Sequence, residues 1–373
     1  MPGSSSFLRV RLLAWVLVAA ALSGCAGTNT IRGQFQYDVR PADKRSELVW
    51  PKPPDKPRYR YAGELIGEHN FEVRDKSAAT LGSAMKWVIG LFDTSEPFTL
   101  QRPQHGVVAD NGRIYVVDAG RKAVLVFDPN PPADGKSNKD GGQLIVWDGR
   151  DGTVGFAAPM AVAEVWDGDI AVSDAGHGAV VRINRDGQMV GALGEQHLQR
   201  PTGLAFDRSR GLLYVADTQA NDIKIYESNG LLVDTIGGPG EEDGQLNAPT
   251  FLSFVDDHLY VSDTLNSRIQ VFDNEGRRVR GFGERGLYIG NMARPKGIAL
   301  GDAGITYVIE SYYGYLLAYN DKNELLLGIN GTGAEEDKFT LPSGVWTDKH
   351  RRVYVADMFN GRVVVFQLLD AKD

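Results

Sequence analysis

The sequence predicts an all-β fold in which six similar sheets surround an axis, a six-bladed β-propeller. Three observations support this. Glycine is frequent (44 residues), and Val, Ile, Tyr and Phe occur in short runs between turn residues, as in chains of many short strands. A strand motif that ends in an acidic residue occurs six times, and a segment near the start of the chain matches the one strand that the last repeat lacks.

The repeated unit contains an apolar strand that ends in an acidic residue and is followed by a second apolar strand. These acids are Asp118, Asp174, Asp217, Asp263, Glu310 and Asp357. They recur at intervals of 56, 43, 46, 47 and 47 residues, which suits the four short strands of a propeller blade. A proline begins the first strand of each unit, where its missing N–H removes no needed hydrogen bond. These prolines are Pro103, Pro159, Pro201, Pro249, Pro295 and Pro342.

The individual units resemble the NHL repeat. Residues 201–207 followed by 213–218 carry the resemblance, as do residues 260–272, and it extends over residues 100–369. It implies a six-bladed propeller of the NHL type. Units two and five depart from the pattern, with Gly176-His177-Gly178 and Ser311-Tyr312-Tyr313 in the turn, so these turns are candidate functional positions.

A strand from the N-terminal part is expected to close the ring. The last unit ends after its third strand, residues 363–366, and residues 61–67 have the same form as the fourth strand at 231–237. Without a fourth strand the last sheet would keep an unpaired edge. The sequence therefore predicts a propeller over residues 58–369, with a closing strand within 58–70 and a connecting segment over 71–99.

The first residues have the form of an export signal. Arg9 and Arg11 precede an apolar run, residues 12–21, that is too short to span a membrane comfortably. Cys25, the only cysteine, follows Leu22-Ser23-Gly24, which resembles the bacterial lipobox. The resemblance implies a lipoprotein signal peptide at 1–24, a lipid on Cys25, and, from Ala26, transfer to the outer membrane. An ordinary secretory signal with an incidental cysteine is the alternative.

Residues 25–57 are expected to be a linker, because prolines crowd its end and favour an extended spacer between the anchor and the propeller. The formal net charge of -8 and the pI near 5.4 argue against nucleic acid as a partner. Binding a phosphate backbone depends on clustered Lys and Arg.

One face of the propeller is the candidate binding surface. In each blade the first strand begins and the second strand ends on this face, where the links between blades also lie. Loops that gather at one end of a rigid scaffold commonly carry function. The residues predicted there are Arg102, His105, Arg121, His177, Arg200, Phe251, Arg294, Lys296, Tyr312, Tyr313 and Phe359.

Two residue sets are candidate metal ligands. The six repeated acids could form a ring of ligands, but their presence in every blade favours hydrogen bonds to backbone N–H groups. His69, His105, His177 and His197 are weak candidates for zinc, since neighbouring blades carry them. The peptidylglycine-amidating lyase, a related propeller, holds zinc with histidines inside the ring. The residues that follow the six prolines here are Gln104, Met160, Thr202, Thr250, Lys296 and Ser343, so no metal or cofactor and no catalytic residue is assigned.

A short helix is predicted before the first blade, within residues 77–92. Leu81, Met85, Val88 and Phe92 recur at helical spacing, and Trp87 lies among them. Such a helix could cap the channel mouth, dock a partner protein or contact a membrane surface.

The sequence contains no nucleophile–base pair, phosphate-binding glycine loop or haem attachment motif. We expect a lipid-anchored, non-enzymatic scaffold of the bacterial cell envelope that docks a protein partner. The resemblance to lipid-anchored NHL proteins implies an electron-transfer or export assembly. One alternative is a metal-dependent lyase or hydrolase, using zinc or calcium at the channel mouth. The other is a propeller that binds a small ligand or glycan.

Overall fold

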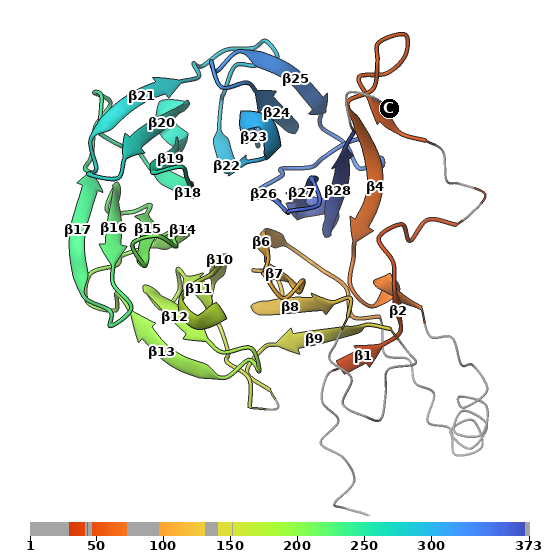
Figure 1. Cartoon of the computed structure of the whole chain (residues 1–373), viewed down its shortest axis with the longest axis horizontal. Helices are drawn as coiled ribbons and strands as arrows, with labels where there is room; N and C mark the ends of the chain where they lie inside the picture. Colours follow the sequence, from red (N-terminus) through yellow and green to blue (C-terminus); the bar gives the residue numbers. More distant parts are fainter. Residues whose placement is uncertain are drawn as a thin grey trace, which may run out of the picture.

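Six sheets stand around a central axis in the computed structural model, which describes residues 30–41, 43, 47–72, 97–130, 141–150 and 152–369 (Figure 1). The predicted six-bladed β-propeller is therefore confirmed. The helices within these residues are single 3-10 turns, at Glu68–Asn70, Trp166–Gly168, Thr264–Asn266, Asp302–Gly304 and Met358–Asn360. None of the described helices has the length and apolar character needed to cross a bilayer.

Blades 2 to 5 are four-stranded antiparallel sheets of consecutive strands, with the first strand nearest the axis (Figure 1). Blade 2 contains β10 (Pro159–Glu164), β11 (Ile170–Asp174), β12 (Ala179–Ile183) and β13 (Met189–Leu193). Blade 3 contains β14 (Pro201–Asp207), β15 (Leu212–Asp217), β16 (Asp222–Tyr226) and β17 (Leu232–Gly237). Blade 4 contains β18 (Pro249–Val255), β19 (His258–Asp263), β20 (Arg268–Asp273) and β21 (Arg278–Phe282). Blade 5 contains β22 (Pro295–Leu300), β23 (Thr306–Glu310), β24 (Tyr315–Tyr319) and β25 (Leu325–Asn330).

Blades 1 and 6 each gain strands from the N-terminal part of the chain. Blade 1 contains β6 (Pro103–Val108), β7 (Ile114–Asp118), β8 (Ala123–Asp128), β9 (Gln143–Trp147) and the added β1 (Thr30–Arg32). Blade 6 contains β26 (Val345–Thr347), β27 (Arg352–Asp357), β28 (Arg362–Leu368), then β4 (Tyr59–Leu65) and β3 (Val49–Trp50). Both sheets are therefore five-stranded.

Pairing of β4 with β28 closes the ring, as predicted. The two strands are antiparallel, with Val363 opposite Leu65 and Leu368 opposite Tyr59. Leu65 is fully buried, and the Glu64 carboxylate lies 3.3 Å from the Arg362 guanidinium. β28, the last strand of the chain, thus gains β4 from the N-terminal part as its neighbour.

The N-terminal segment that we predicted as a spacer adds strands to the propeller instead. β1 pairs with β9, β2 (Gln34–Phe35) pairs with β5 (Phe71–Glu72), and β3 pairs with β4. Apolar side chains explain the difference. The ring centroids of Trp50 and Phe366 lie 5.2 Å apart, and those of Phe35 and Phe71 lie 5.4 Å apart. β1 also covers the outer edge of β9.

The core lies between neighbouring sheets. The second and third strands of a blade are buried on both sides, and every residue of β7 and β8 is buried. Such strands read as continuous apolar runs. Outer strands such as β17 are mostly exposed, so their pattern is mixed. The innermost strands leave only the axis open, which makes the two ends of the axis the places to look for a site.

Candidate docking face and central channel

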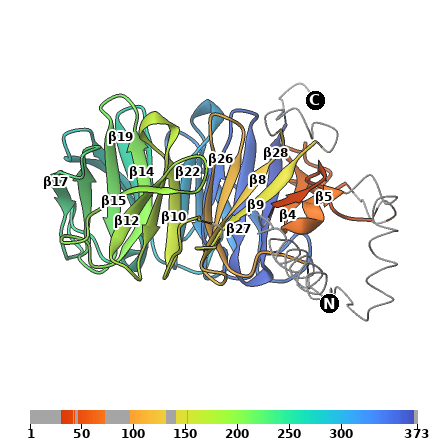
Figure 2. The same cartoon turned by 90° about the horizontal axis from the view of Figure 1, so that it is seen from below.

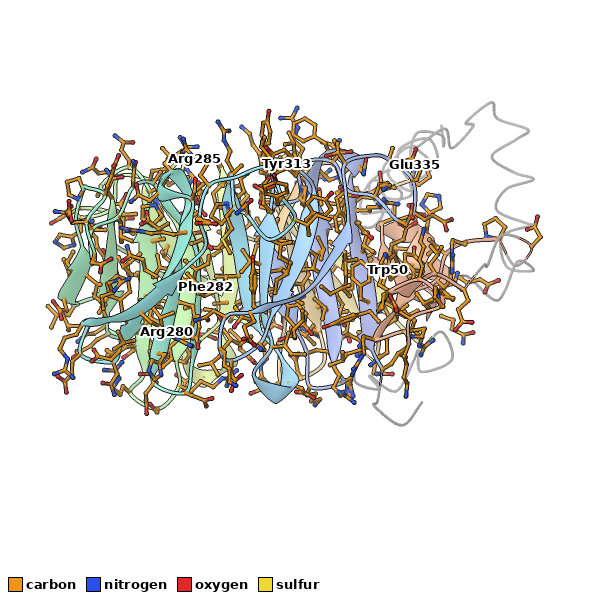
Figure 3. All side chains as sticks on the ribbon, turned by 90° about the horizontal axis from the view of Figure 1, so that it is seen from above. Trp50, Arg280, Phe282, Arg285, Tyr313 and Glu335 are labelled. Atoms are coloured by element: carbon orange, nitrogen blue, oxygen red, sulfur yellow. The ribbon has the colours of Figure 1, made fainter. Side chains whose placement is uncertain are left out.

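The two faces of the disc carry different turns. We call the loop face the one with the links between blades and the turns between second and third strands. Arg285, Tyr313 and Glu335 lie along that edge in Figure 3, and Arg280 lies toward the other edge. Figure 2 shows the disc edge-on from the other side. The opposite face carries the turns between first and second strands and those between third and fourth strands.

The repeated acids are fully buried and hold the loop face together. Asp118 accepts hydrogen bonds from the N–H groups of Gln101 at 2.6 Å, Arg102 at 3.0 Å and Arg121 at 2.9 Å. It therefore joins the link that enters the blade to the turn after the second strand. This supports the hydrogen-bonding role over the ring of metal ligands.

The other five blades use the same bond. Asp174 accepts from Ala157 and Ala158, Asp217 from Gln199 and Arg200, Asp263 from Asn247, Glu310 from Arg294, and Asp357 from Thr340. Burial raises the pKa of Asp174, but the backbone donors outweigh burial and hold the pKa below its usual value. The loop face is therefore rigidly mounted on each blade.

Three exposed arginines surround the loop-face mouth of the channel. Arg102, Arg200 and Arg294 each precede the proline of an innermost strand, in blades 1, 3 and 5. Within the described residues their side chains make no ion pair. Lys296 follows in the mouth itself, half-buried and likewise without a carboxylate partner there. Burial, then the nearby Arg294 charge, lowers the Lys296 pKa.

Some carboxylates farther from the axis on the loop face are paired. Glu336 binds Arg40 at 3.0 Å, Asp337 binds Lys52 at 3.3 Å, and Asp243 binds Arg278 at 2.9 Å. Other carboxylates in the links form no ion pair within the described residues: Glu195, Glu241, Glu242, Glu284 and Glu335. The face therefore carries cations around the channel mouth and acids farther out, in a chain whose formal net charge is -8.

Aromatic side chains from blades 5 and 6 lie on the same face. Tyr312 is 58% exposed and meets Tyr313 edge-on at 4.9 Å, and Phe359 is 54% exposed. The Arg102 guanidinium lies 5.8 Å from the Phe359 ring. Arg121 is committed within the protein, because it lies over the Phe98 ring and donates to the Thr99 carbonyl.

Two residues predicted for the binding surface are buried in the channel instead, and that part of the prediction is wrong. His105 is 8% exposed and Phe251 is 3% exposed. Their rings, from opposite blades, stack with centroids 5.3 Å apart, and Trp346 lies 5.7 Å from His105. Both occupy the position where blade 3 has Gly203, whose Cβ would lie 2.4 Å from the Thr250 carbonyl oxygen. Blade 3 therefore has no room for a side chain at this position, whereas His105 and Phe251 carry their rings into the channel.

The candidate histidines form no metal-binding cluster. His69, His177 and His197 are exposed, and His177 Nδ1 lies 2.9 Å from Asp174. Over the described ranges, no three potential metal-binding side chains gather. Burial lowers the His105 pKa to about 4, so this ring is neutral at neutral pH.

A cavity of about 260 Å³ on the opposite face was missed by sequence reasoning. It is the half of the central channel that opens on the opposite face. His105, near the start of β6, is the lining residue nearest to the loop face. The signal for it was present: His105 and Phe251 replace glycine at matching positions of opposite blades.

Several predicted residues lie outside the described part of the chain. These are Cys25 and the helix residues Leu81, Met85, Trp87, Val88 and Phe92.

Comparisons with known proteins show the fold. No family model and no curated protein matches this chain. Virginiamycin B lyase from Staphylococcus aureus is 14% identical, with a TM-score of 0.51 over 72% of this chain and 96% of that one. A gluconolactonase from Xanthomonas campestris is 16% identical, with a TM-score of 0.55 over 72% and 87%. An auxiliary nutrient binding protein from Bacteroides thetaiotaomicron is 11% identical, with a TM-score of 0.55 over 73% and 70%. These neighbours share the fold and differ in function.

Proposed function

We propose that this chain is a lipid-anchored, non-enzymatic scaffold of the NHL type in the bacterial cell envelope. Its loop face docks a protein partner of an envelope assembly, in electron transfer or export. Cys25 carries the lipid, on the outer membrane, and the propeller faces the periplasm or the cell surface. The lipobox resemblance supports the anchor, and the NHL-like repeats support the family.

The observation that carries the docking proposal is the set of exposed arginines and aromatic rings on a rigid face. Arg, Tyr and other aromatic residues are enriched among the residues that dominate binding energy at protein interfaces. Arg102, Arg200 and Arg294 have backbone N–H groups fixed by buried acids, so the face is ordered before a partner binds. A preordered face loses less conformational entropy on binding.

The charge pattern indicates the chemistry of the partner. The centre of the face carries cations without ion pairs, whereas the links farther out carry acids, some of them paired. Complementary charge accelerates encounter and selects partners. We propose that the docked surface is acidic opposite the channel mouth.

The channel chemistry favours a scaffold over an enzyme. A solved virginiamycin B lyase complex with quinupristin carries a catalytically inactive histidine-to-alanine variant. In this chain the one channel histidine of the described residues, His105, is neutral and packed between Phe251 and Trp346. Thr202, Thr250 and Ser343 near the mouth already make hydrogen bonds within the protein.

Site-specific crosslinking in intact cells tests the docking face. A photoreactive amino acid at Tyr312 or Phe359 should give a discrete crosslinked band in the envelope fraction. The same amino acid at Asn111 or Lys322, exposed in turns on the opposite face, is the matched control. The acidic-partner proposal predicts that changing Arg102, Arg200 and Arg294 to glutamate removes the band. Equal bands from both faces, or none from the loop face, would contradict the docking proposal.

The anchor has a separate test. Metabolic labelling with a palmitate analogue should mark the wild-type chain and leave Cys25→Ala unlabelled. Wild-type protein that is exported without label would show an ordinary secretory signal in place of the lipobox.

A further inference from the structure

Lys296 differs from the other polar residues around the loop-face mouth because its side chain has no partner. The residues that follow the six prolines form an inner ring there: Gln104, Met160, Thr202, Thr250, Lys296 and Ser343. Ser343 donates a hydrogen bond to the Gln104 side chain at 3.1 Å. Thr202 donates to the Thr250 carbonyl at 2.9 Å, and Thr250 Oγ1 lies 2.7 Å from a neighbouring threonine hydroxyl. Within the described residues, the Lys296 ammonium group makes neither a hydrogen bond nor an ion pair.

No nearby group compensates the Lys296 charge. Lys296 is half-buried, and burial lowers its pKa because the charged form loses water. Arg294 lowers the pKa further, and no carboxylate opposes these two effects. Across the axis, blade 2 has the uncharged Met160 at the same position of the inner ring. Lys296 is therefore a cation that lacks both full hydration and a counter-charge, and an anion from outside the chain would supply the counter-charge.

The arginines at the mouth extend this positive region to the surface. Arg102, Arg200 and Arg294 are exposed, belong to alternate blades and form no ion pair in the described part of the chain. Buried acids hold their backbone N–H groups, so the strand starts that carry them are fixed. An anion that approaches the mouth meets the arginines first and the less hydrated Lys296 within.

The position of Lys296 indicates the shape of the anion. Exposed arginines can pair with acids on a flat surface, whereas a half-buried ammonium group inside the mouth requires a group that projects into the channel. A protruding acidic loop or chain end of a protein has both the reach and the charge. A charge-assisted hydrogen bond to a poorly hydrated ammonium group is also stronger than one between neutral groups.

We propose that the partner docked on the loop face inserts an acidic segment into the channel mouth, where one of its carboxylates pairs with Lys296 and others pair with the arginines at the rim. This inference rests on the proposed docking function. It adds which part of the partner is bound: a protruding acidic segment, in place of a flat acidic surface.

Titration with tetraglutamate tests the site without the partner. The full-length chain, purified in a non-ionic detergent, should bind tetraglutamate at about 0.15 M salt, and uncharged tetraglutamine should not bind measurably. Lys296→Met should weaken binding at least about tenfold, because it removes a charge-assisted hydrogen bond. Met160 shows that the inner ring accommodates a methionine. Isothermal titration calorimetry measures these affinities.

Lys322→Met is the matched control. Lys322 is exposed on the opposite face, so the same change in net charge should alter the affinity less than about twofold. NMR of the ¹³C-lysine-labelled chain gives a second readout. Bound tetraglutamate should raise the pKa of Lys296, since a neighbouring carboxylate favours the charged form. Equal weakening by the two variants, or a Lys296 pKa that the bound peptide leaves unchanged, would overturn the proposal.

Zero-length crosslinking in intact cells separates this inference from the docking proposal. A carbodiimide joins an amine to a carboxylate in direct contact. Mass spectrometry should therefore find Lys296 linked to an acidic residue of the same protein that a photoreactive amino acid at Tyr312 captures. Lys296→Arg keeps the charge but lacks the amine, so it should lose this link and retain the Tyr312 band. A Tyr312 band with unlinked wild-type Lys296 would refute the inserted segment alone, whereas the absence of that band would contradict docking itself.

Discussion

Blades 6 and 1, where the two ends of the chain meet, differ from blades 2 to 5 in how they are held together. In blades 2 to 5 each outer strand follows its neighbour directly in sequence. In blade 6 the strand next to β28 is β4, so Leu65 pairs with Val363 across almost the whole domain. The seam between blades 6 and 1 therefore depends on long-range contacts, and every added N-terminal strand lies there. Contacts between consecutive strands are enough to form blades 2 to 5, whereas blade 6 needs strands from both the N-terminal and the C-terminal part of the chain.

Deleting strands at the seam should show which of them the fold needs. Deletion of Tyr59–Leu65 should abolish cooperative unfolding and cause aggregation, because β28 is left with a long unpaired edge. Deletion of Thr30–Arg32 is the control and should lower Tm only slightly, because these residues cover the outside of a complete blade. Thermal unfolding followed by circular dichroism measures both. Similar effects from the two deletions would show that the seam has no special role.

Single side chains sharpen the same comparison. Leu65→Ala should lower the free energy of unfolding by about 4 kcal/mol, since Leu65 is fully buried between blades. Ile31→Ala in β1 should cost less than about 1 kcal/mol, because Ile31 is only half-buried. Urea denaturation gives both values. Equal losses would mean that β1 is as deeply integrated as β4.

The buried histidine at the seam should make stability depend on pH. Folded His105 stays neutral down to about pH 4, whereas an unfolded histidine takes up a proton near pH 6.5. The unfolded state therefore binds more protons as the pH falls below 6.5. The free energy of unfolding should fall by about 3 kcal/mol between pH 6.5 and pH 4 from this residue.

His105→Phe is the matched variant for this effect. It should lose less stability than the wild type over the same interval in urea denaturation. Parallel curves for the two proteins would show that His105 is not the group that titrates.

The smallest expected effect concerns the ion pair at the seam. Burial raises the pKa of Glu64 although Arg362 opposes the shift, so its charge is poorly accommodated. Arg362 keeps Asp357 at 2.9 Å and the carbonyl groups of Glu335 and Lys338 without it. Glu64→Gln should therefore change the free energy of unfolding at pH 7 by less than about 1 kcal/mol in either direction. A loss of several kcal/mol would show that the pair holds the seam.

Most of the fold could be predicted because the same strand motif occurs six times in the sequence. In blades 1 to 5 the proline begins the first strand and the acid ends the second, so Pro201 and Asp217 pair as expected. In blade 6 the first strand begins only at Val345, so the prediction that Pro342 begins it is wrong. The closing strand was also predictable from its likeness to β17. The added strands β1 and β3 were not, because two or three residues carry no periodicity and Trp50 lies in a proline-rich stretch.

The site was only partly predictable. Topology alone assigns Arg102, Arg200 and Tyr312 to the loop face, since loop position follows from strand order. It cannot say whether a side chain at the start of a strand points to solvent or across the axis. His105 and Phe251 were therefore assigned to the surface, and the cavity was missed. The contact between His105 and Phe251 joins opposite blades, and the spacing of residues in the sequence does not predict contacts between opposite blades.

The buried acids fix the backbone of the residues before each proline without constraining which side chains those residues carry. Each acid holds the backbone N–H of the residue before the proline, or of its neighbour, and never its side chain. The side chain before the proline therefore differs between blades, as Arg200 beside Ala158 and Leu341 illustrates, while an acid still holds the backbone there. The six positions around the axis can thus present different side chains for recognition on one common architecture.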